Sequence, residues 1–172
     1  MGNYGRVCVL AVAALTFCAT EANAQTATST FTVTATVAAN CTITTVGITF
    51  GSYDPVVAHQ ATPLDSNGSV TVACTSGATT TIGMDQGLTP TATSTAAAPE
   101  RQMASGPDFL RYDLYQDAAR TTVWGDVGTP AEVTYVSTSF APTLIDIFGQ
   151  IPAGQDVNVG TYSDTVTATI SF

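Results

Sequence analysis

The chain has 172 residues, a formal net charge of −9 at pH 7 and no lysine. This surplus of carboxylates repels phosphate groups, which argues against nucleic acids and anionic membranes as partners. Charged residues make up only 10% of the sequence, well below the usual quarter of a globular protein, and threonine, serine, alanine and glycine take their place.

The first 24 residues have the pattern of a secretory signal peptide. Arg6 precedes an apolar stretch over Val7–Ala19, and Ala22-Asn-Ala24 forms a cleavage motif before Gln25. The apolar stretch is too short to span a bilayer, which needs about 20 residues, so no stable membrane insertion is expected. Cys18 raises a lipoprotein alternative, but the bulky Phe17 before it disfavours lipidation.

Removal of this peptide leaves a chain long enough for one domain with one core. Two cysteines remain in it, Cys41 and Cys74. A cysteine pair in an exported chain is most simply a disulfide. Two cysteines and one distant histidine, His59, cannot build a closed metal site.

Strand patterns then follow one another along the chain, and helix patterns are almost absent. Phe31, Val33, Ala35 and Val37 alternate with threonines, and a second pattern runs from Cys41 to Phe50. Further period-two runs, rich in β-branched residues, follow. They contain Val70, Val72 and Cys74; Ile82 and Met84; Leu110, Tyr112 and Leu114; Val133 and Tyr135; and Ile145–Phe148.

Turn signals separate these runs. Asn67-Gly68 predicts a tight turn before the run that ends at Cys74. Residues 89–99 have low complexity and two prolines, which predicts an exposed loop that could be modified. About eight short strands with Gly, Pro and Asp turns predict a single all-β sandwich.

The last run reaches the end of the sequence. Val166, Ala168, Ile170 and Phe172 lie on one face of the predicted strand, and small polar residues lie on the other. The apolar face needs a cover, and an open strand edge is a template for another strand. This pattern is typical of an assembly subunit.

A series of motifs in a fixed order carries a family resemblance. They are Phe31–Val37, Asn40-Cys41, Phe50–Pro55, Val70–Thr75, Leu110–Tyr115, Asp117–Gly125, Phe148–Gln155, Gly160–Asp164 and the terminal Phe172. Across essentially the whole chain after the signal peptide, this resembles the spore coat protein U domain family, which includes the pilin subunits of archaic chaperone–usher pili (the Csu type).

The resemblance implies an incomplete immunoglobulin-like sandwich completed by donor-strand complementation. Residues 25–38 would form the N-terminal donor segment and residues 39–172 the pilin domain. Phe31, Val33, Ala35 and Val37 would be the donor plugs. Val166, Ala168, Ile170 and Phe172 would form the edge strand that a chaperone contacts. Implied partners are copies of the chain or related pilins, a periplasmic chaperone and an outer-membrane usher.

Catalytic and cofactor motifs are missing from the sequence, so we expect no enzymatic activity, no cofactor and no metal site. Single aspartates stand in turn-like contexts, and His59 is expected to face solvent. Trp124 could stack on a sugar, although a lone tryptophan in a sandwich usually packs in the core.

Three functions are compatible with the sequence. The leading hypothesis is a structural subunit of a secreted surface fibre, a pilus that polymerises by donor-strand exchange and supports attachment and biofilm formation. The alternatives are a single-domain adhesin that binds a surface glycan, and a coat or matrix protein whose own N-terminal strand completes its fold.

Overall fold

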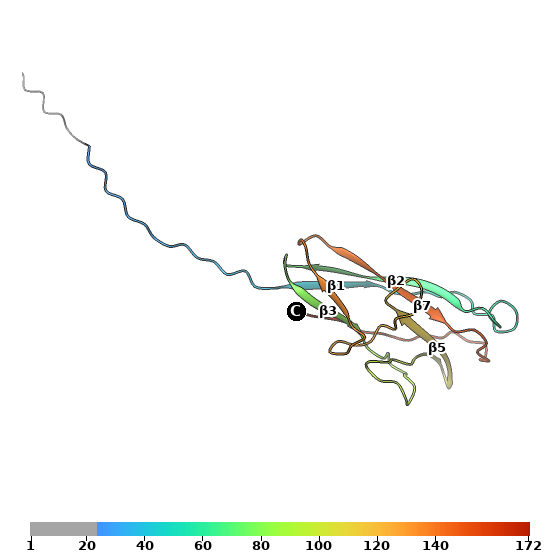
Figure 1. Ribbon diagram of the computed structural model, residues 1–172. Coiled ribbons are helices and arrows are strands. Elements are labelled where there is room, and N and C mark those ends of the chain that lie inside the picture. The colour runs from blue at the N-terminus through green and yellow to red at the C-terminus, as the bar shows by residue number, and fades with distance from the viewer. Residues whose placement is uncertain (1–23) are drawn as a thin grey trace, which may run out of the picture. The chain divides into compact units, whose positions relative to one another are not determined.

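The computed structural model describes residues 24–172 (Figure 1). The predicted signal peptide, residues 1–24, therefore lies almost entirely outside the described residues. Residues 24–35 form an extended segment without secondary structure, and a second unit, Thr36–Phe172, contains all the strands.

Eight strands make up this second unit. They are β1 (Cys41–Val46), β2 (Leu64–Cys74), β3 (Thr79–Met84), β4 (Arg101–Ser105), β5 (Asp108–Tyr115), β6 (Val133–Val136), β7 (Thr143–Ile151) and β8 (Ala168–Ser171).

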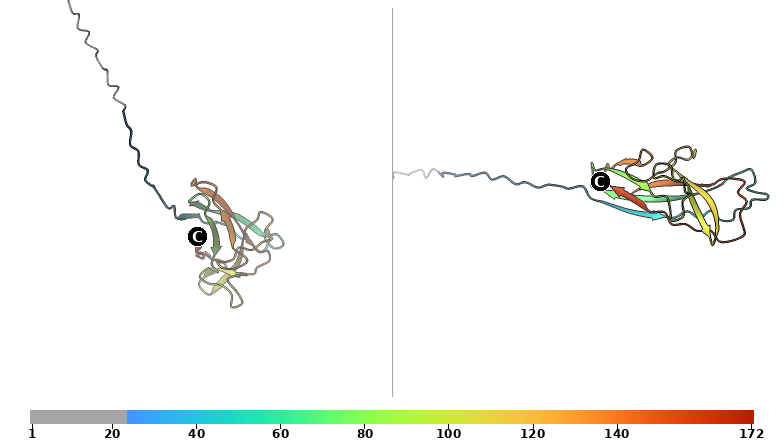
Figure 2. Two further views of the ribbon diagram at one scale, coloured as in Figure 1. Left: turned by 60° about the vertical axis from the view of Figure 1, so that its left-hand side comes forward. Right: turned by 90° about the horizontal axis from the view of Figure 1, so that it is seen from below.

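The strands form two antiparallel sheets, which confirms the predicted all-β sandwich. A five-stranded sheet has the order β1-β2-β7-β5-β4, and a three-stranded sheet has the order β6-β3-β8. Figure 2 shows β1 and β8, at one edge of each sheet, side by side near the C-terminus. The first and the last strand of the chain therefore each form the edge of one sheet.

The core lies between the sheets and comes from the predicted alternating positions. Val70 and Val72 of β2, Ile82 of β3 and the side chain of Trp124 are fully buried. Alternation places one side of each strand inward, so these apolar side chains meet in one cluster. The period-two runs of β3, β5, β6 and β7 were correctly predicted as strands.

The predicted turn at Asn67-Gly68 is wrong, because both residues lie inside β2 and pair with Phe148 and Ile147 of β7. A Cβ atom on Gly68 would approach the carbonyl oxygen of Val46 to 2.6 Å. Glycine is needed here because the chain after β1 crosses closely over this strand, which is its other common use besides turns.

Two strand ends also differ from the prediction. The run expected from Cys41 to Phe50 ends as a strand at Val46, because the chain then leaves β2 and crosses over the inner face of the sheet. The C-terminal strand β8 is shorter than predicted, so Val166 and Phe172 lie outside it. Residues 89–99 form the predicted loop.

Cys41 and Cys74 form the predicted disulfide, which joins the start of β1 to the end of β2 across the antiparallel pair. The bond closes a loop with a sequence separation of 33 residues. It fixes β1 at the edge of the five-stranded sheet, at the point where the N-terminal segment joins the domain.

Replacing both cysteines by alanine should lower the free energy of unfolding by about 2–4 kcal/mol, because the unfolded chain regains its loop entropy. Denaturant unfolding of the protein without its predicted signal peptide measures this. Alkylation without reduction should add no mass to the wild type; added mass would show free thiols.

Candidate functional site

A groove of about 1070 Å³ lies beside the close approach of β1 and β8. One rim is the segment 45–55, which continues from β1, and the other is the segment 157–166, which leads into β8. The floor is apolar and includes Met84, Leu110 and Ile147. Apart from Thr45 and Val46 at the end of β1, the residues of the two rims lie outside the strands.

Glycines let the first rim pass over the five-stranded sheet. A Cβ atom on Gly149 of β7 would lie 2.9 Å from both Ile48 Cδ1 and Phe50 Cζ, and one on Gly68 would lie 2.8 Å from Ile48 Cγ1. Ile48 and Phe50 thus fill the space that a side chain on the inner face of β2 or β7 would otherwise occupy. The first rim is a row of half-buried apolar side chains at the groove wall.

The second rim, residues 157–166, has the alternation of a strand and a partner on only one edge. Ser163 exchanges two backbone hydrogen bonds with Ala104 of β4, at 2.9 and 3.1 Å. Asp85 donates its backbone N–H to the carbonyl of Thr167 on the same edge. Within residues 24–172, the backbone N–H and C=O groups of Tyr162, Asp164 and Val166 form no hydrogen bond.

Side chains along this rim alternate between half-buried and exposed. Tyr162, Asp164 and Val166 are half-buried, whereas Ser163 and Thr165 between them are exposed. The half-buried series therefore faces the groove and continues into Ala168 and Ile170 of β8. Asp164 is the one charged residue in this otherwise apolar and aromatic series.

Asp164 is held by three hydrogen bonds. The hydroxyl of Tyr112 donates to Oδ2 at 2.6 Å, and the backbone N–H groups of Leu88 and Thr165 donate to Oδ1 at 2.9 and 2.8 Å. A Cβ atom on Gly87, where φ is +76°, would lie 2.1 Å from Oδ2. Only glycine leaves room for the carboxylate at this point, and the bonds fix the rim to β5 and to the loop after β3.

The electrostatics of this contact follow from its burial. Burial is the main cause that raises the pKa of Tyr112, and the hydrogen bond to Asp164 raises it further. The phenol therefore stays protonated and donates this hydrogen bond. The ring of Phe50, on the first rim, meets Tyr112 edge-on with centroids 6.2 Å apart. At the level of Asp164 the groove is therefore crowded from both rims.

A buried arginine supports the groove floor from behind. Arg101 of β4 is fully buried and donates from Nε to the carbonyl of Asp85 and from Nη2 to the carbonyls of Met84 and Trp124, each at 2.8 Å. Burial lowers the pKa of its guanidinium, and the nearby carboxylates of Asp85 and Asp113 act in the opposite direction. Arg101 thereby ties β4 to the end of β3 and to the Trp124 segment.

A compact loop forms the far end of the first rim. The rings of Tyr53 and His59 stack with centroids 5.1 Å apart, and His59 Nδ1 accepts the backbone N–H of Asp54 at 3.0 Å. The carboxylate of Asp54 accepts the N–H groups of Val56 and Val57. The expectation that His59 simply faces solvent is therefore wrong, because the ring is half-buried and holds this turn.

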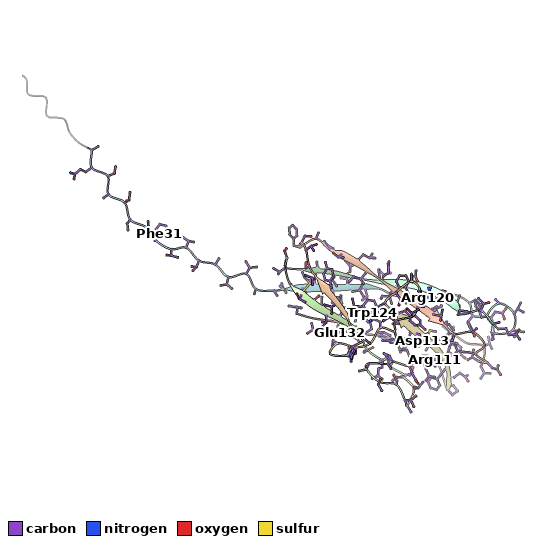
Figure 3. All side chains as sticks on the ribbon, viewed as in Figure 1. Phe31, Arg111, Asp113, Arg120, Trp124 and Glu132 are labelled. Carbon is purple, nitrogen blue, oxygen red and sulfur yellow. A yellow bond between two sulfur atoms is a disulfide. The ribbon has the colours of Figure 1, made fainter. Side chains whose placement is uncertain are left out.

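The structure places Trp124 in the core, where its indole N–H donates to the carbonyl of Ile82 at 2.9 Å (Figure 3). Because it is fully buried, it cannot stack on a sugar at the surface. The sequence alternative of a glycan site at Trp124 is thus contradicted.

The predicted donor plugs and edge residues can also be located. Phe31, Val33 and Val37 are 80% exposed or more, Ala35 is exposed, and all four lie in a segment without strand pairing (Figure 3). Val166, Ala168 and Ile170 are half-buried along the groove side, and Phe172 is 56% exposed. Sequence reasoning missed Asp164, Tyr112 and Arg101 as site residues. For Asp164, the sequence signal was a charged residue at an inward position of the alternating run near the C-terminus.

Within residues 24–172 the structure contains no group of three His, Cys, Asp or Glu side chains that could hold a metal ion. The same stretch contains no helix that is long and apolar enough to cross a membrane.

Comparison with known proteins places this fold. The sequence model of the Spore Coat Protein U domain matches residues 27–169. The chain belongs to the Spore Coat Protein U domain family. Its relative Protein U from Myxococcus xanthus is 41% identical over 176 residues, which cover 94% of this chain and 97% of the relative.

A solved structure shares the immunoglobulin-like sandwich of this Spore Coat Protein U domain. It is the crystal structure of the CsuC–CsuE chaperone–tip adhesion subunit pre-assembly complex from archaic chaperone–usher Csu pili of Acinetobacter baumannii. The match has a TM-score of 0.51 and 24% identity and covers 80% of this chain. The match covers only 40% of the chain in that structure, so the similarity shows a shared fold and nothing further.

Replacing Arg101 by methionine should lower the free energy of unfolding by at least about 3 kcal/mol, because three buried carbonyls lose their donor. Arg101→Lys should lose less, since it keeps a charge and donors but not the planar fork. Denaturant unfolding of both variants measures this, and a methionine variant as stable as the wild type would contradict the role given to Arg101.

Acid should release the turn at Asp54. The hydrogen bonds from Val56 and Val57 hold the pKa of this carboxyl below its ordinary value of 3.8. A depressed pKa stabilises the fold above the unfolded-state value, and this contribution is lost as the pH falls through the folded-state value. The ¹³C resonance of the carboxyl should titrate below pH 3.8; a midpoint at or above 3.8 would contradict the bonded turn.

Proposed function

We propose that this chain is a structural subunit of a secreted surface fibre of the chaperone–usher type, which polymerises by donor-strand exchange. Segment 25–38 of one copy fills the groove of the next. The observation that carries the proposal is the second rim, whose backbone groups at Tyr162, Asp164 and Val166 are unpaired beside an apolar floor. An extended segment that adds to such an edge gains backbone hydrogen bonds and places alternate side chains in the groove.

The N-terminal segment has the properties of such an occupant. Phe31, Val33 and Val37 alternate with threonines and are exposed in the single chain. Burying each of these three side chains stabilises an assembly by about 1.5–3 kcal/mol. Ordering the segment costs about 1–2 kcal/mol per residue, so a preformed groove and a continuous backbone ladder decide the balance.

Export and assembly factors complete the proposal. The predicted signal peptide sends the chain to the periplasm, where a chaperone covers the groove and an outer-membrane usher exchanges the chaperone for the next copy. The fold shared with the chaperone–tip adhesion subunit complex supports these partners. The fibre lies outside the cell and serves attachment and biofilm formation, and its role is structural, not catalytic.

A second candidate has its own support. The 41% identity to Protein U extends over nearly the full length of both chains, within a family named for a spore coat protein. In this case the chain is a coat or matrix protein whose own N-terminal strand completes its fold. Such a protein is a stable monomer and does not form a fibre.

The gel pattern of the exported protein separates the two. Unboiled samples of a fibre subunit should give a ladder of multimers that collapses to one band on boiling in SDS, because donor-strand polymers are kinetically trapped. Deletion of residues 25–38 should abolish the ladder. A single protease-resistant monomer band in both lanes would favour the coat protein.

A matched pair of substitutions tests the face of the segment that matters. Val33→Asp should remove most of the ladder, because a buried carboxylate without partners is strongly unfavourable in the groove. Thr32→Asp introduces the same charge on the opposite face and should leave the ladder nearly unchanged. Equal loss in both variants would argue against one-sided burial of the segment.

A further inference from the structure

We propose that the groove accepts its donor in one register, in which Ala35 of a neighbouring copy lies directly opposite Asp164. The donor segment then runs antiparallel to the second rim, and the pairs are Phe31 with Ala168, Val33 with Val166, Ala35 with Asp164 and Val37 with Tyr162. This inference rests on the proposed function and assigns the contact that sets the alignment of the two copies.

The direction and the parity follow from the unpaired edge. All strand pairings of the domain are antiparallel, so an added strand continues the pattern by running antiparallel to the rim. The rim residues whose backbone groups are free are also those whose side chains face the groove, namely Tyr162, Asp164 and Val166. Directly opposite side chains share a face, so inward rim residues pair with the inward donor residues, which are the odd-numbered ones.

This parity leaves a choice of which donor residue meets Asp164, and the space at that level decides it. The carboxylate is already bonded to Tyr112 at 2.6 Å, and the ring of Phe50 reaches Tyr112 from the other rim. A valine here would push branched methyl groups against the carboxylate of Asp164 without offering it a hydrogen bond. Alanine, the smallest inward donor residue, adds one methyl group.

The same alignment matches sizes elsewhere in the groove. The largest donor side chain, Phe31, meets Ala168, the smallest inward residue of the series, beside the flexible Met84 that pairs with Ala168. A shift by two residues one way sets Phe31 against Ile170, a large residue against a large one. A shift the other way sets Phe31 against Val166 and puts Val33 at the carboxylate. Alternation of large and small side chains favours the proposed register.

Cysteine pairs on the outward face can read the register without touching the groove. In the proposed alignment Thr34 of the donor lies opposite Thr165, and Ser163 and Thr167 lie one diagonal step to either side; all four are exposed. Directly opposite residues have Cα atoms about 4.5–5.5 Å apart, within the range of a disulfide, whereas the diagonal neighbours lie about 7–8 Å away.

The full-length chain is exported with Thr34→Cys combined in turn with Ser163→Cys, Thr165→Cys or Thr167→Cys, and is then oxidised mildly. The Thr165 combination should give a covalent ladder on boiled, non-reducing gels, at least ten-fold stronger than the other two. Each single-cysteine variant serves as the control for reshuffling with Cys41 or Cys74. A second donor probe, Thr32→Cys, should move the strongest cross-link to Thr167, as antiparallel pairing requires.

The outcomes separate the register from the proposed function. A dominant cross-link at Ser163 or Thr167 with Thr34→Cys overturns the register, and so does a shift of the Thr32→Cys cross-link toward Ser163. A heat-sensitive ladder without any covalent ladder also overturns it, because the donor then does not pair with this rim. Absence of the heat-sensitive ladder itself overturns donor-strand polymerisation.

A size change tests the fit at Asp164 independently. Ala35→Val should reduce the yield of the multimer ladder at least ten-fold, whereas Ala38→Val, the same change at an outward position, should leave it within two-fold. The double variant Ala35→Val, Asp164→Ala should recover part of the ladder, since removing the carboxylate makes room. Equal tolerance of valine at both positions would overturn the assignment of Ala35 to Asp164.

Discussion

The architecture of this domain depends on an extended segment that is held along only one edge. Residues 157–167 are fixed by Ala104 and Asp85 on one side, while their other row of backbone groups faces a groove. An unpaired edge beside an apolar floor is unfavourable in a finished protein, and natural sandwiches usually cover or blunt it. The groove opens along this edge, and Asp164 helps to keep the edge in place.

Polar contacts hold the rim where a ladder is missing. The side chain of Asp164 links it to Tyr112 on β5 and to Leu88 in the loop after β3, and Arg101 braces the end of β3 from behind. These groups place directed hydrogen bonds inside a surface that is otherwise apolar. The groove is therefore shaped by side chains of the domain itself.

The sequence predicted the fold better than the site. Strands rich in β-branched residues, such as those around Val72 and Ile82, bury one face and so carry a period-two signal that sequence alone displays. The turn predicted at Asn67-Gly68 was wrong because Gly68 is needed where two chain segments cross closely. Such a crossing is a tertiary contact, which the local sequence does not reveal. Strand β4 was missed because its inward residue is the charged Arg101, which reads as surface in a sequence.

The site residues were hidden for a related reason. Asp164, Tyr112 and Leu88 come from three distant segments, and nothing in their local patterns says that they meet. What the sequence did display was the periodicity of the segments at its two ends, 31–37 and 166–172, and the cysteine pair. Family membership and the shared sandwich then give these patterns a common context.

The scarcity of basic residues has a consequence for the lifetime of the protein among secreted proteases. Enzymes that cut after lysine or arginine find no lysine, and within residues 24–172 they find only Arg101, Arg111 and Arg120. Arg101 is inaccessible, and Arg111 lies within β5. Only Arg120 stands in a loop, and its guanidinium lies against the Phe148 ring and beside Asp65. To a trypsin-like protease the folded chain therefore offers almost no substrate.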